Sequence, residues 1–110
     1  MTLLQQMERQ RLEKRERLRQ EVCRRLREVL DRTIPGQLVF VFGSLITPGK
    51  FTDESDIDLA LESEPPGMTI YQLIGLLSER MGRRVDVILL DECRFRDRIL
   101  REGEPWTPRA

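Results

Sequence analysis

Residues 2–32 contain neither glycine nor proline, and this feature constrains the fold more than any other. Glu, Arg, Gln and Leu dominate the stretch, and all four are good helix formers. We therefore expect one long N-terminal helix within residues 1–35. Its second half carries apolar residues at spacings of three and four, typical of a helix that packs on a core, whereas its first half is mostly charged. Half of the helix should pack and half should project.

The projecting end carries a small apolar tip formed by Leu3, Leu4 and Met7. Such a tip fits a frayed terminus, and it equally fits a contact with another chain, such as a homo-oligomer built through this helix. The sequence leaves both interpretations open.

After Pro35 and Gly36, the core region 36–110 alternates between strand and helix patterns. A length of 110 residues suits one domain, so the helix and this core should form a single unit. The predicted order of helix, strand, strand, helix, strand, helix indicates an α+β fold, a small mixed β-sheet with helices on one face. The elements predicted after the first helix are strands near 37–44, 56–62 and 83–91 and helices near 69–81 and 93–103.

The composition excludes several kinds of function. The chain has no histidine, which removes Ser-His and Cys-His nucleophile pairs and imidazole metal sites. No apolar run approaches the roughly 20 residues that cross a bilayer, so we expect no membrane contact. Two cysteines and no secretory signal pattern favour a reduced, cytoplasmic protein. Residues 1–36 are basic and the rest acidic, but the N-terminal charges are interleaved as in a solvated helix, so direct nucleic-acid binding is not expected.

Three features call for a common explanation. Gly43 and Ser44 end an apolar strand, Asp56 and Asp58 alternate with apolar residues in the next strand, and Asp86 interrupts a third. An isolated inward-facing carboxylate is costly to keep charged. If the second and third of these strands are neighbours, however, the three carboxylates converge, and Mg²⁺ with its oxygen ligands would neutralise them. The backbone at Gly43 and the hydroxyl of Ser44 could then approach a phosphate.

These residues resemble the nucleotidyltransferases of the DNA polymerase beta superfamily in their smallest form, the minimal nucleotidyltransferases. The family pattern is a Gly-Ser, about ten residues, an Asp-x-Asp and a third acid on a later strand, and the resemblance spans roughly residues 36–103. It implies two Mg²⁺ ions held by Asp56, Asp58 and Asp86, and ATP cradled by Gly43 and Ser44. It further implies that Asp86 assists deprotonation of the acceptor hydroxyl during nucleotidyl transfer.

The chain departs from the family pattern in the loop between Ser44 and Asp56. This loop is one residue longer than usual, and "LITPGKF" replaces the Arg-Gly that often follows the Gly-Ser. Lys50 is the cation that could substitute in nucleotide binding.

Small stand-alone members of the family are commonly antitoxins whose partner is a small helical HEPN-type toxin. The resemblance thus implies transfer of AMP from ATP to a tyrosine hydroxyl of such a partner, since 110 residues leave no room for a second substrate-binding domain. The altered loop motivates an alternative, a catalytically weak or inactive binding module that neutralises the partner by contact. A weaker third possibility is a nucleotidyltransferase that modifies small molecules.

Overall fold

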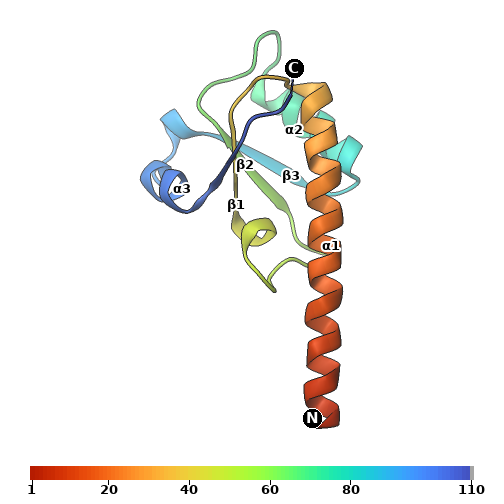
Figure 1. Cartoon of the computed structure of the whole chain (residues 1–110). Helices are drawn as coiled ribbons and strands as arrows, with labels where there is room; N and C mark the ends of the chain where they lie inside the picture. The colour runs from red at the N-terminus through yellow and green to blue at the C-terminus, as the bar shows by residue number, and fades with distance from the viewer. Residues whose placement is uncertain (110) are drawn as a thin grey trace.

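The computed structural model describes residues 1–109. Four strands form one sheet, two long helices lie on one side of it, and a short helix lies on the other side (Figure 1). None of the described helices is long and apolar enough to cross a membrane. The elements are α1 (Leu3–Thr33), β1 (Val39–Phe42), the 3₁₀ helix η1 (Gly43–Ile46), β2 (Ile57–Leu61), α2 (Ile70–Met81), β3 (Val85–Leu89), the 3₁₀ helix η2 (Leu90–Glu92), α3 (Arg96–Glu102) and β4 (Glu104–Trp106).

Helix α1 is the long helix that the sequence predicts. Thr2 caps its first turn in a reciprocal capping box with Gln5, and the helix stops before Pro35, which disfavours helical geometry at the preceding residue. Only Val22, Leu26 and Leu30 of the helix are buried. The N-terminal half extends well beyond the rest of the molecule (Figure 1). The whole molecule is therefore elongated, 55 Å long but only 28 Å across.

The sheet is mixed and has the strand order β3-β2-β1-β4. Strand β1 pairs antiparallel with both β2 and β4, and β2 pairs parallel with β3. The parallel pair is joined through α2, whose ends follow the sequence signals: Thr69 forms a capping box with Gln72, and Gly82 ends the helix in the left-handed conformation. The predicted α+β class with a small mixed sheet and a long N-terminal helix is confirmed. The expectation of helices on one face holds for α1 and α2 only, because α3 packs on the opposite face of the sheet.

The two faces of the sheet are covered unequally. Alternate residues of the strands, among them Val41, Leu59 and Val85, pack with α1 and α2 in the main core. The residues between them face the other way, where a small cluster of Phe40, Ala60, Leu90 and Ile99 lies under α3. We call this second side the open face. It is the side on which the carboxylates of β2 and β3 lie.

The sequence analysis did not predict strand β4. Its three residues include Pro105 and show no alternating pattern, and they form a strand because β1 offers them a free edge. Trp106 is buried opposite Val39, with the guanidinium carbon of Arg27 3.8 Å from its ring centroid. The other strands are shorter than predicted by one or two residues at each end, so Asp56 directly precedes β2. The expected core region 36–110 ends at Ala110, outside the described residues.

Candidate active site

Parallel pairing of β2 with β3 brings the predicted carboxylates to one patch of the open face. Asp58 and Asp86 are direct register partners. Asp56 lies two residues before Asp58, on the same side of the chain, and the neighbouring Ile57 amide donates to the carbonyl of Arg84 at 3.0 Å. The sequence could only suppose that these strands are neighbours, and the structure shows that they are.

The electrostatics of this patch show uncompensated negative charge. Partial burial raises the pKa of Asp58, and the nearby carboxylates of Asp86 and then Asp56 raise it further. Arg84 opposes this effect, because its Nε lies 3.0 Å from Oδ1 of Asp86. The same hydrogen bond, together with the field of the carboxylates, raises the pKa of the Arg84 guanidinium. Among residues 1–109, Arg84, whose side chain is largely exposed, is the cation that opposes the charge of these three acids.

Gly43 packs directly against the carboxylate patch. It follows β1 with φ +79°, and a Cβ built on it would lie 2.5 Å from Oδ2 of Asp58. Both the backbone conformation and the close approach therefore require glycine at this position. Since Phe42 is the register partner of Asp58, the end of β1 and the start of β2 hold this contact in place.

Ser44 follows within the turn of η1 and is half-buried. Its carbonyl accepts from the Thr47 amide at 3.1 Å, while its hydroxyl forms no hydrogen bond within residues 1–109. The backbone after Gly43 thus turns tightly beside Asp58 and leaves a hydroxyl available to a ligand.

Comparison with known proteins places this arrangement in a family. The family profile described as polymerase beta nucleotidyltransferase matches residues 24–106, well over half of the chain. The chain belongs to the polymerase beta nucleotidyltransferase family. Neither the curated proteins nor the solved structures contain a significant match. The match begins within the packed half of α1 and ends at Trp106, so all four strands of the nucleotidyltransferase domain lie inside it.

The donor set of the domain suits Mg²⁺. The carboxylates of Asp56, Asp58 and Asp86 supply oxygen ligands, and the raised pKa of Asp58 marks a place where a cation would be stabilised. Within residues 1–109, no three carboxylate or thiol side chains are grouped tightly enough to hold a metal ion by themselves. Mg²⁺ does not need such a cage, because it commonly takes one or two carboxylates and completes its shell with water and phosphate oxygens.

Lys50, the remaining residue predicted to bind nucleotide, forms no hydrogen bond or ion pair with the carboxylates of this patch. It is exposed in the loop between η1 and β2, and its side chain forms no ion pair or hydrogen bond with another of the described residues. Its amide closes a turn by donating to the Thr47 carbonyl at 3.2 Å.

An apolar pocket of about 490 Å³ adjoins Gly43 on the open face. It lies between η1, the exposed side of the strands and α3, with the charged ends of Arg98 and Glu102 at its margin. The residues that line it are Phe42, Gly43, Ile46, Thr47, Pro48, Ile88, Phe95, Arg98, Ile99 and Glu102. The pocket therefore places an apolar space directly beside Gly43.

Sequence reasoning missed the arginines around this site. Arg84 has the simplest signal, since it stands two residues before Asp86 and must share its face of β3. Arg19 reaches η1, and Arg15 and Arg83 reach the loop between η1 and β2, all from distant parts of the chain. No local pattern could have indicated those contacts.

Proposed function

We propose that this nucleotidyltransferase domain transfers AMP from ATP, with Mg²⁺, to a tyrosine hydroxyl of a partner protein. The observation that carries the proposal is the placement of Gly43 against Asp58, with Asp86 as the register partner of Asp58. A tight turn and two neighbouring carboxylates thus share one corner of the open face. This combination suits chemistry on a phosphate group better than it suits a structural role.

The residues would divide the work as follows. Asp56, Asp58 and Asp86 would hold two Mg²⁺ ions, which supply neutralisation of charge on the attacking and leaving oxygens. Gly43 and Ser44 would receive the triphosphate, the first through close backbone approach and the second through its hydroxyl. Asp86 would accept the proton of the acceptor hydroxyl as its oxygen bonds to the α-phosphorus and pyrophosphate leaves. Lys50, exposed in the neighbouring loop, could reach the outer phosphates.

The open face bears on the partner class. It carries an apolar pocket of about 490 Å³ beside Gly43, lined by Phe42, Ile46 and Phe95 among others. An acceptor presented by another folded chain fits such a face. From the family resemblance, we propose a small helical HEPN-type toxin as this partner and an antitoxin role for the chain.

The test is label transfer from α-phosphate-labelled ATP with Mg²⁺ to proteins that co-purify with the chain from its native host. The wild type should label one small partner, and the Asp56→Asn/Asp58→Asn double variant should not. The matched control is Asp53→Asn/Glu54→Gln, which removes the same charge from exposed positions nearby and should label normally. Absence of label with the wild type, despite a co-purifying partner, would refute the transferase proposal.

The second candidate is a binding module that neutralises its partner by contact alone. The exposed apolar tip of α1 favours it, since Leu3 and Leu4 are 72% and 78% exposed. They belong to the N-terminal end of α1, which projects away from the sheet (Figure 1). Under this alternative, the Asp56→Asn/Asp58→Asn variant would still protect cells from the partner. A Leu3→Ser/Leu4→Ser variant would lose protection.

A further inference from the structure

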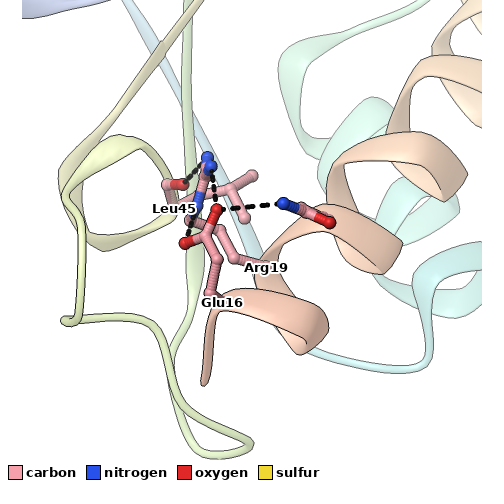
Figure 2. A network of polar contacts seen from close by, with 4 residues as sticks. Glu16, Arg19 and Leu45 are labelled. Atoms are coloured by element: carbon pink, nitrogen blue, oxygen red, sulfur yellow. Dashed lines mark hydrogen bonds and ion pairs between the residues drawn. The ribbon is translucent and has the colours of Figure 1, made fainter. Parts of the chain in front are cut away.

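Helix α1 contacts the loop that follows Ser44 through a pair of charged side chains. Nη1 of Arg19 donates to the carbonyl oxygen of Leu45 at 3.4 Å. Glu16 holds the same guanidinium in a fork, with Nε–Oε2 at 2.9 Å and Nη2–Oε1 at 2.6 Å. Figure 2 shows the guanidinium of Arg19 between the carboxylate of Glu16 on α1 and the carbonyl of Leu45 in η1. The direction of the Arg19 side chain is therefore set by Glu16.

The contacted carbonyl belongs to the residue directly after Ser44. Leu45 lies in η1, and carbonyls at the end of a helix lack partners within it. A cation at this end is favourable, so Arg19 satisfies a group that the turn leaves open. The Leu45 side chain is fully buried in the main core. Ser44 thus lies between two restrained residues. Gly43 packs against Asp58, and the carbonyl of Leu45 accepts from Arg19.

A second arginine of α1 holds the same loop four residues later. Nη1 of Arg15 donates to the carbonyl of Gly49 at 3.0 Å. At the far end of the loop, Arg83 donates to the carbonyls of Thr52 and Ser55 at 3.2 and 2.8 Å. The loop that joins the Gly-Ser turn to the Asp-x-Asp strand is therefore braced from both sides, and α1 braces the part nearest Ser44.

The Glu16–Arg19 pair suits a positioning role better than a stabilising one. Both side chains remain partly exposed, and such pairs contribute little to the free energy of unfolding. A forked carboxylate–guanidinium pair nevertheless fixes geometry, because two parallel hydrogen bonds allow one orientation. The mutual hydrogen bond lowers the pKa of Glu16 and raises that of Arg19, so the pair stays charged at neutral pH.

We propose that Arg19, oriented by Glu16, is a positioning residue for the nucleotide site: it fixes the backbone after Ser44 so that the serine faces the triphosphate. This inference rests on the proposed function, since it assumes that Gly43 and Ser44 receive a nucleotide. It adds residues of α1 to the machinery of the site, although they touch no substrate.

The test compares Arg19→Met, which keeps the aliphatic stem and removes the donors, with Arg24→Met as the matched control. Arg24 lies on the same helix and pairs with Glu28 at 3.2 Å, but it has no hydrogen bond to the loop. Three quantities are measured on the full chain: the dissociation constant for ATP with Mg²⁺, amide hydrogen exchange of residues 43–52, and the thermal midpoint.

We expect Arg19→Met to weaken ATP binding about three- to tenfold, the scale of one ordinary hydrogen bond, because the effect on the nucleotide is indirect. It should speed amide exchange in residues 43–52, while its thermal midpoint stays close to that of Arg24→Met. Arg19→Lys, which can still reach the Leu45 carbonyl, should recover part of the binding. Glu16→Gln should weaken binding less than Arg19→Met, and the Glu16→Gln/Arg19→Met double variant should be no worse than Arg19→Met alone.

The outcomes separate this proposal from the proposed function. Equal ATP binding and equal loop exchange in Arg19→Met and Arg24→Met would overturn the positioning role while leaving the transferase intact. If the wild type binds no ATP, the proposed function fails and the positioning role fails with it. Faster loop exchange in Arg19→Met would then show only that Arg19 restrains the loop. If Arg19→Met does not fold, the same three quantities are measured on Glu16→Gln, which is nearly isosteric with the wild type. Glu28→Gln is then the control.

Discussion

The two faces of strand β2 differ in what their side chains do. Toward α1 and α2, Ile57, Leu59 and Leu61 are almost completely buried and join the main core. Toward the open face, Asp58 is only partly buried, beside other carboxylates, at a position where ionisation is disfavoured. One face of this five-residue strand therefore serves packing alone, whereas the other combines the buried Ala60 with a carboxylate whose ionisation is disfavoured. Substitutions on the two faces should accordingly have different effects, which can be tested face by face.

The largest effect is expected on the covered face. Leu59→Ala removes a 1% exposed side chain from the main core and should lower the free energy of unfolding by about 2–5 kcal/mol. Leu4→Ala, the same substitution on the projecting half of α1, should change it by less than about 0.5 kcal/mol. Urea unfolding measures both. A small loss for Leu59→Ala would mean that the core beneath β2 is less closely packed than the structure shows.

Gly43→Ala comes next, at the border between the open face and η1. A non-glycine residue at φ +79° costs about 1–2 kcal/mol, and the new methyl group would also displace the Asp58 carboxylate. ATP binding should fall more than stability does. Gly75→Ala in α2 is the control, since its Cβ meets nothing within 4 Å and alanine favours a helix, so stability should rise by about 0.5–1 kcal/mol. Unchanged ATP binding in Gly43→Ala would show that the turn does not receive the triphosphate.

Asp58→Asn should raise the stability of the protein while it abolishes activity. Because burial and neighbouring carboxylates disfavour the charged Asp58, its neutral replacement should raise the stability of the metal-free protein, by less than about 1 kcal/mol. Label transfer should be abolished at the same time. Thermal unfolding with a chelator present measures the first effect. A clear loss of stability would show that the charge of Asp58 has a structural partner.

The smallest effect is a pH dependence of the same residue. A folded-state pKa raised above the unfolded value means that the native protein holds its proton longer, so this contribution to stability is present at low pH. It is lost as the pH rises from the ordinary aspartate pKa, about 3.9, through the raised value. The unfolding free energy of wild type minus that of Asp58→Asn, in chelator, isolates the effect from other acids. We expect this difference to fall with rising pH, and a flat or rising difference would mean that folding does not raise the pKa of Asp58.

Sequence reasoning succeeded where the signal was local. The bounds of α2 follow from Thr69 and Gly82, and the length of α1 follows from the absence of helix breakers before Pro35. It also indicated the open-face carboxylates, because an acid inside an apolar strand needs a reason. It failed where strand pairing determines the structure. Strand β4 has no sequence pattern of its own, and its strand geometry comes from pairing with the free edge of β1.

The same limit applies to the candidate site. Spacing alone suggested Lys50 as the nearby cation, but spacing says nothing about where a loop residue lies. The arginines that reach the loop come from α1 and from the segment before β3, and their contacts span 26 to 34 residues of sequence. Such contacts are known only once the chain is folded.

The pairing of β4 with β1 has a consequence for synthesis on the ribosome. The first of the four strands to be made becomes an inner strand of the sheet, and one of its two neighbours is the last of the four to be made. Until Trp106 has left the exit tunnel, β1 therefore presents an unpaired edge of alternating Val and Phe, the kind of edge that recruits other strands. A chain released before β4 is complete would instead carry a nearly finished sheet whose exposed edge favours aggregation.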